Sequence, residues 1–175
     1  MAKKTLNSAI DELMKNYESA LKEAVEYAVN KAAEDIYTES LNCLEMYYNS
    51  YEPTSYERTD YLWRAILPYA EQIQRTKDGI VGRAGVVYDA SRLDGVYEGS
   101  KKYGYADGSW ILENYLRGIH PATDGSSIPG EAYYYENVDA TSPTDTMNEY
   151  LGKYVKTTFH NNILVSFAKQ IARMK

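Results

Sequence analysis

Metal chemistry would need histidines or carboxylates at ligand spacing, and neither pattern occurs in this chain. His120 and His160 are the only histidines, and neither belongs to an HExxH or HxxxH arrangement. Carboxylates stand beside glycines in Asp89–Asp94 and in TDGSSIPGE, but neither stretch alternates oxygen ligands up to a distal glutamate, as a calcium loop does. We therefore expect turns at both places and no metal site.

The sequence also lacks a recognised motif for phosphate binding or for nucleophilic catalysis. GIVGRAG spaces Gly79, Gly82 and Gly85 three apart, whereas phosphate-binding loops use GxxxxGK[ST] or GxGxxG at the start of a helix. A valine-rich strand follows, which favours a hairpin turning at Asp78-Gly79 with a bulge at Gly82 or Gly85. Cys43 stands in a helical pattern without a neighbouring base, and no GxSxG occurs. We expect neither an enzyme nor a cofactor. An unrecognised hydrolase that uses some of the 25 carboxylates stays open as an alternative hypothesis.

Tyrosine is the unusual residue type, with 19 copies against 2 phenylalanines. A tyrosine ring can be buried while its hydroxyl stays hydrated, which suits subunit interfaces and sugar or peptide grooves. The densest group is YYNSYEPTSYERTDYLWRAI, from Tyr47 to Ile66. Its rings either close the core where a long helix turns back, which we favour, or form a glycan- or peptide-binding groove or a contact between subunits. These interpretations depend on Tyr47, Tyr48, Tyr51, Pro53, Arg58, Thr59, Leu62, Trp63 and Ile66.

A long amphipathic helix is predicted to lead into this segment. From Leu6 to Tyr47 apolar residues recur mostly three or four positions apart, no glycine or proline intervenes, and Pro53 prevents extension. If it continues to about Asn49, the helix is roughly 65 Å long, whereas a compact chain of this length is about 40 Å across. The helix must break or overhang, and an overhanging apolar stripe needs a partner. This pattern predicts an oligomer.

The remaining elements predict an α+β fold in a single domain. Thr59 begins a short helix that includes Ile66, and a second short helix runs from a cap at Ser109 to Gly118. The long loop that follows holds a strand near Tyr133–Glu136. The expected regions of the domain 1–175 are the long N-terminal helix 1–50, a small antiparallel sheet with short helices and loops over 51–140, and the C-terminal helix 141–175.

The C-terminal helix has a well-marked start. Ser142-Pro143 supplies a cap and a proline at the first helical position, and Asp145 suits the positive end of the helix dipole. The helix carries a second apolar stripe, formed by Met147, Tyr150, Leu151, Tyr154, Thr158, Leu164, Phe167, Ile171 and Met174.

Charge and cysteine content limit the partners. The net charge is −6 and the basic residues are scattered, so free binding to nucleic-acid backbones is not expected. A single cysteine excludes an intramolecular disulfide. No apolar run reaches signal-peptide length at the N-terminus or 18 residues anywhere. We expect a protein made in the cytoplasm, without a membrane partner.

The stretch EPTSYERTDYLWRAI, after a long amphipathic helix, resembles the tail-completion, or head-to-tail joining, proteins of long-tailed double-stranded DNA bacteriophages. Relatives in that family follow the helix with a proline, a Thr-Gly or Arg-Thr step, a leucine and a final isoleucine. Asp60 stands where glycine is common, and Ala65 where serine is common. The matching positions are Pro53, Arg58, Thr59, Leu62 and Ile66, with the tyrosine run Tyr47, Tyr48 and Tyr51 before them and the step Gly118-Ile119-His120 after them.

This resemblance implies a structural virion protein with no active site. Its place would be a homo-oligomeric ring in the phage neck, between the portal side of the head and the tail tube. The implied partners are its own copies and neighbouring neck and tail proteins, namely a head-completion protein and a tail terminator or tail tube, with DNA only in transit through the channel. The alternative from a different class is a tyrosine-rich module that binds glycans or peptides.

Overall fold

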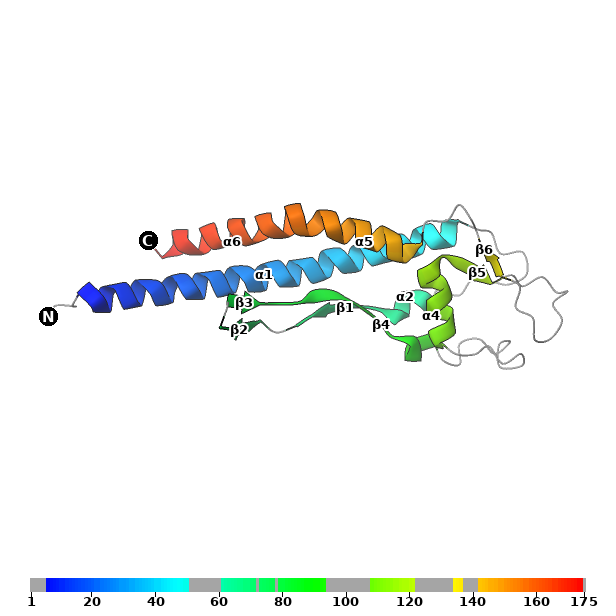
Figure 1. Cartoon of the computed structure of the whole chain (residues 1–175), viewed down its shortest axis with the longest axis horizontal. Helices are drawn as coiled ribbons and strands as arrows, with labels where there is room; N and C mark the ends of the chain where they lie inside the picture. Colours follow the sequence, from blue (N-terminus) through cyan, green and yellow to red (C-terminus); the bar gives the residue numbers. More distant parts are fainter. Residues whose placement is uncertain are drawn as a thin grey trace. The chain divides into compact units, whose positions relative to one another are not determined.

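The computed structural model of the chain describes residues 6–50, 61–71, 73–77, 79–93, 108–121, 134–136 and 142–174. These residues form an α+β fold with a long N-terminal helix, small strand pairs and a long C-terminal helix, as the sequence predicted (Figure 1). By their contacts they group into two compact units, while the single domain expected over 1–175 stays a prediction. Unit 1 comprises Met1–Glu34, Tyr69–Gly85 and Lys153–Lys175, and unit 2 comprises Asp35–Pro68 and Val86–Gly152.

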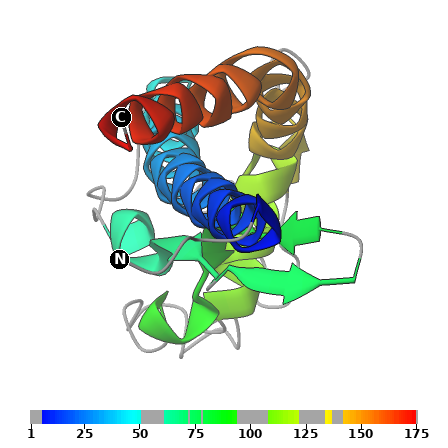
Figure 2. The ribbon, with the colours of Figure 1, turned by 90° about the vertical axis from the view of Figure 1, so that its left-hand side faces the viewer.

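The N-terminal helix α1 spans Leu6–Asn49, so its 44 residues form one uninterrupted element. At 1.5 Å per residue it is about 66 Å long, close to the length expected from the sequence. Within unit 1 the helix is flanked on two sides, by the C-terminal helix and by a β-hairpin (Figures 1 and 2). Four alanines that face inward at intervals of four residues are almost fully buried, which lets neighbouring backbone approach closely: Ala20, Ala24, Ala28 and Ala32.

After α2, Tyr61–Ala65, the chain becomes extended earlier than predicted. Ile66 was expected within the short helix, but it is the first residue of β1, Ile66–Ala70. The reason is Pro68, which restricts the preceding Leu67 to extended backbone and so prevents the helix from continuing.

A β-hairpin follows, with β2, Gln74–Thr76, paired antiparallel with β3, Gly79–Val81. It closes one residue earlier than the predicted turn pair, because Thr76 pairs with Gly79 and the glycine belongs to β3. Gly79 has a φ of 147°, a backbone conformation that side chains disfavour, which accounts for glycine at this position.

The ribbon continues as β1 paired with β4, Ala84–Tyr88, while the bulge expected at Gly82 or Gly85 stays a prediction. The Glu71 amide donates to the Arg83 carbonyl at 2.8 Å, while Gln74 pairs with Val81. A Cβ built on Gly82 would lie 2.6 Å from Val29 Cγ2 of α1. The missing side chain allows the ribbon to rest against the helix.

Unit 2 holds further short elements around its core. The 3-10 helix η1 spans Ala90–Leu93, and the helix α4 spans Gly108–Arg117, so Ser109 lies inside the helix and is not its cap as predicted. Gly118, with φ 72°, ends α4 as expected. The strand predicted near Tyr133–Glu136 is β6, Tyr134–Glu136, and it pairs antiparallel with β5, Ile119–Pro121.

The C-terminal helical segment begins with the predicted cap and then contains an unpredicted turn. In α5, Pro143–Tyr154, the Asp145 amide donates to Ser142 Oγ at 3.0 Å and the Ser142 hydroxyl donates to Asp145 Oδ2 at 2.8 Å. One π-helical turn, Val155–Phe159, separates α5 from α6, His160–Arg173. The π-turn makes room for an extra residue in the helix.

Candidate functional site

The tyrosine-rich segment contributes to the hydrophobic core of unit 2. The ring of Tyr47 meets that of Tyr115 edge-on, with centroids 5.1 Å apart and an interplanar angle of 85°. This arrangement is the favourable one for two aromatic quadrupoles. Tyr115 is fully buried, and its hydroxyl approaches the Ser40 carbonyl at 3.4 Å. The buried residues of this cluster are Leu44, Tyr47, Leu62, Ala65, Ile66, Leu93, Leu112 and Tyr115.

The nine residues singled out from the sequence fall into three groups. Tyr47, Leu62 and Ile66 are core residues, and Tyr48 and Trp63 are half-buried against the same cluster. At the end of α1, Tyr47 and Tyr48 therefore pack in or against the core of unit 2. The other four, Tyr51, Pro53, Arg58 and Thr59, lie outside the described residues.

Burial also governs the protonation of the groups in this core. Burial raises the pKa of the Tyr115 phenol, and the neighbouring Tyr88 adds to the rise. Burial likewise raises the pKa of Tyr88, while a hydrogen bond with Ser40 acts in the opposite direction. Cys43 is 1% exposed, and burial, with a smaller contribution from Glu39, raises the pKa of its thiol to about 11. A thiol in this state is protonated at neutral pH and unsuited to nucleophilic attack.

The histidines are not brought together with other ligands in the part of the chain that the structure describes. His160 is exposed at the start of α6, and His120 belongs to β5. Among the described residues no group of three or more His, Cys, Asp or Glu side chains could hold a metal ion. None of the described helices combines the length and apolar character that crossing a membrane requires.

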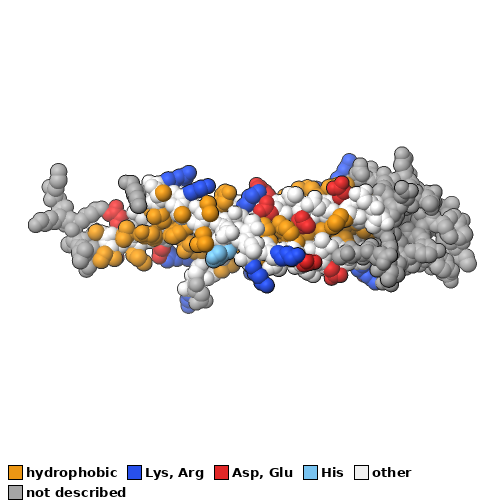
Figure 3. All heavy atoms as spheres, turned by 90° about the horizontal axis from the view of Figure 1, so that it is seen from above, with side chains coloured by type: hydrophobic (Ala, Val, Ile, Leu, Met, Phe, Trp, Pro, Cys, Tyr) orange, Lys and Arg blue, Asp and Glu red, His pale blue; other side chains and the backbone are white. Residues whose placement is uncertain are grey.

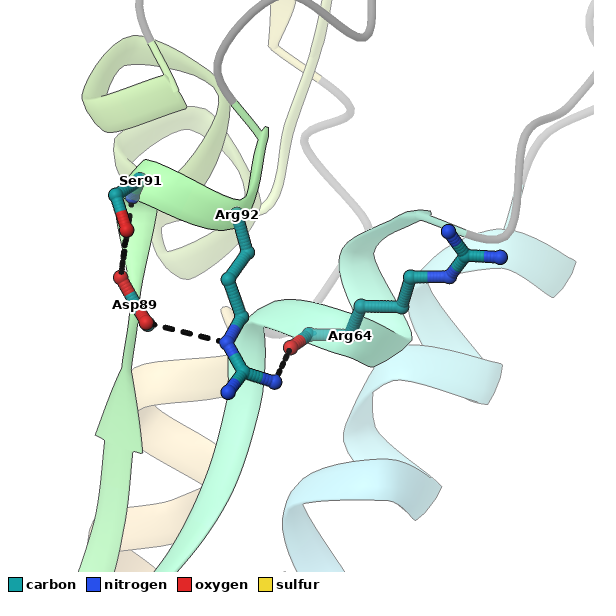
Figure 4. A network of polar contacts seen from close by, with 4 residues as sticks. All are labelled: Arg64, Asp89, Ser91 and Arg92. Carbon is teal, nitrogen blue, oxygen red and sulfur yellow. Dashed lines mark hydrogen bonds and ion pairs between the residues drawn. The ribbon is translucent and has the colours of Figure 1, made fainter.

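A polar network connects η1 to the end of α2 (Figure 4). Asp89 accepts hydrogen bonds from the Ser91 hydroxyl at 2.6 Å and from Arg92 Nε at 3.2 Å. The hydrogen bond from Ser91, joined by Arg92, holds the pKa of Asp89 below its usual range. Arg92 also donates from a terminal nitrogen to the Arg64 carbonyl at 3.1 Å, and the Asp89 amide donates to the Ala65 carbonyl at 2.7 Å. These bonds satisfy backbone groups at an element end, which is a structural role.

Beside this network lies an open depression of about 480 Å³ on unit 2. Its aromatic side chains, Tyr37 and Trp63, are half-buried, and its two arginines are exposed. Aromatic rings beside guanidinium groups could contact a sugar face or an acidic peptide. The lining residues are Tyr37, Trp63, Arg64, Ile66, Leu67 and Arg92.

The most prominent surface feature of unit 1 is an exposed apolar stripe along the first turns of α1. Every residue from Ser8 to Ser19 is exposed, although the apolar spacing there is the same as in the buried part of the helix. In Figure 3, hydrophobic side chains gather at the end of the described face where α1 begins and α6 ends. We call the α1 stripe the five large side chains, which are 40–58% exposed: Ile10, Leu13, Met14, Tyr17 and Leu21.

The α1 stripe leaves five large apolar side chains about half exposed on the first turns of the helix. Tyr17 is the one member with a described ring contact, since its ring lies 6.4 Å from that of Phe167 in α6. The stripe offers exposed apolar area, which suits a matching apolar surface.

Comparisons with known proteins give this chain no relative: no protein-family model, no curated protein and no solved structure matches it.

Proposed function

We propose that this protein is a non-enzymatic structural subunit that assembles with its own copies. We further propose that the assembly is a ring in the neck of a long-tailed phage virion, where it completes the tail and joins it to the head. The observation that carries the self-assembly is the exposed α1 stripe. The location in the neck is supported by the resemblance of residues 52–66 and the helix before them to tail-completion proteins.

Covering the α1 stripe would provide a moderate driving force. Full burial of a Leu, Ile or Met side chain is worth roughly 1.5–3 kcal/mol, and about half of each stripe side chain is still exposed. Five side chains then contribute roughly 5 kcal/mol to each contact, before the cost of association is subtracted. A single contact of this kind is weak, so assembly should depend on concentration and gain from closure of a ring.

Light scattering coupled to size exclusion, over a wide concentration range, tests the self-assembly. The variant Leu13→Asp/Leu21→Asp places charges in the stripe at positions that are exposed in the single chain, so it should remain folded by circular dichroism and become monomeric. Asn30→Asp, an exposed position of α1 outside the stripe, is the matched control and should assemble like the wild type. A wild-type protein that stays monomeric at the highest concentration would refute the proposal.

The neck location has its own test. Mass spectrometry of purified virions should detect the protein, and electron microscopy of particles lacking it should show heads without attached tails. Intact, tailed particles in its absence would exclude a role in joining head and tail.

A peptide- or glycan-binding role is the second candidate, and the depression lined by Tyr37 and Trp63 is the observation that favours it. A glycan array and an acidic-peptide library would test it, with Trp63→Ala expected to abolish any binding found. Absence of binding in both screens would remove this candidate.

A further inference from the structure

The α1 stripe is the uncovered front part of a longer stripe. Its members at positions 10, 14, 17 and 21 are followed at the same alternating intervals of four and three by Ala24 and Ala28. Both alanines are fully buried, whereas the positions before them are 40–58% exposed. An alternation of three and four is the seam that a second helix covers. The first turns of α1 therefore present a helix-binding seam that α6 of the same chain meets at Tyr17 and that remains about half exposed.

A second apolar strip lies on α6, in the same unit. Leu164 and Val165 are 52% and 54% exposed, and Ala168 and Ala172 are exposed as well. At about 100° per residue these four positions share one side of the helix, opposite the buried Ser166. We call Leu164, Val165, Ala168 and Ala172 the α6 strip. It mixes two large and two small side chains, which allows an incoming helix to approach closely.

Charge identifies which surface fits the seam. Between residues 8 and 34, α1 carries six carboxylates and three lysines, so pairing two α1 helices would bring two net negative surfaces together. Residues 153–174 carry Lys153, Lys156, Lys169 and Arg173 and no acidic residue. A contact between α1 of one copy and α6 of another therefore combines opposite charges along two apolar surfaces.

The contact also has a precedent within the chain. In unit 1, α6 already runs alongside α1 (Figures 1 and 2), with Phe167 next to Tyr17. An intermolecular contact of α1 with α6 would repeat this type of pairing through the outward side of α6.

We propose that the α1 stripe of one copy docks on the α6 strip of a second copy. Because the two surfaces differ, the contact is heterologous, and repetition of it generates a ring when the rotation closes. This inference rests on the proposed self-assembly and specifies the two surfaces that form it.

Cross-linking between two singly substituted proteins tests the pairing. Leu13→Cys places a thiol in the α1 stripe and Val165→Cys places one in the α6 strip, and both positions are exposed in the single chain. Cys43 stays in place, because its burial keeps it unreactive, and the wild type serves as the blank. With a short bismaleimide, the mixture of the two variants should give covalent dimers, and each variant alone should give few. Asn30→Cys mixed with Val165→Cys is the matched control and should give no excess.

Three results would overturn the pairing of α1 with α6, and only the last of them would also overturn the proposed self-assembly. Dimers of Leu13→Cys with itself, as abundant as those in the mixture, would show a symmetric α1 contact and overturn the inference. The same holds if the wild type assembles by light scattering while the mixture gives no dimers. If the wild type is monomeric at every concentration, both the inference and the proposed self-assembly are wrong.

Discussion

Gly82 provides the sharpest test of the packing in unit 1. In the variant Gly82→Ala the new methyl group would lie 2.6 Å from Val29 Cγ2, against 3.4 Å for the near limit of an ordinary contact. The shortfall of 0.8 Å must be met by movement of the ribbon or of a β-branched side chain that is only 2% exposed. Overpacking of this kind typically costs about 1–3 kcal/mol.

Gly85→Ala is the matched control, because a Cβ at Gly85 has nothing within 4 Å. That variant should be neutral, or up to about 1 kcal/mol more stable, since alanine restricts the unfolded chain. The two variants should then differ by about 2 kcal/mol. For a protein of this size the difference corresponds to roughly 4–8 °C in Tm, which thermal unfolding followed by circular dichroism resolves easily.

A double variant ties the effect to the specific contact. Val29→Ala removes the obstructing Cγ2, so Gly82→Ala should cost markedly less in that background, with a coupling free energy of about 1 kcal/mol or more. Equal melting temperatures for Gly82→Ala and Gly85→Ala, or no coupling with Val29→Ala, would refute the close approach of ribbon and helix.

Two further predictions concern the cap of α5 and the buried titratable groups. Ser142→Ala should lower the unfolding free energy by about 1 kcal/mol, because the Asp145 amide loses its acceptor, while Ser142→Thr keeps the hydroxyl and should retain most of the stability. Chemical denaturation measures both variants, and an unchanged midpoint for the alanine variant would contradict the cap. Stability should be level up to about pH 9 and then fall, because Cys43 has a pKa of about 11 in the folded chain against 9.0 normally, and the pKa values of Tyr88 and Tyr115 are raised as well. Such groups favour the folded state below their ordinary pKa and lose that contribution as pH rises through the folded value. Urea midpoints from pH 7 to 11 check this, with Cys43→Ala as the control that should flatten part of the decline.

Local sequence rules predicted most of the helices and strands. The 44 residues of α1, the hairpin, the Ser142 cap and the strand at residues 134–136 all follow from patterns that act over a few residues. The errors at Ile66 and Ser109 concern the boundaries of elements. Pro68 ends the helical backbone before Ile66, and α4 begins at Gly108, before the cap predicted at Ser109.

The surfaces were only partly predictable. The sequence pointed to an uncovered stripe on α1, because a helix of that length exceeds a compact chain of 175 residues. It did not reveal the α6 strip, because the predicted C-terminal stripe assumed regular α-helix through Thr158 and grouped Leu164 with Phe167 and Ile171. The π-turn at Val155–Phe159 breaks that regularity, and no residue type in VKTTF signals it.

The π-turn at Val155–Phe159 sets the direction in which the α6 strip faces. One added residue advances every later side chain by about 100° around the helix axis, so the outward placement of Val165 depends on the number of residues before it as much as on its type. Deleting a single codon within Val155–Phe159 would restore an α-helical phase and rotate the strip away from its present direction while its own sequence stayed intact. Insertions and deletions in these five positions, more than substitutions in the strip itself, are the genetic changes to which the orientation of this surface is most sensitive.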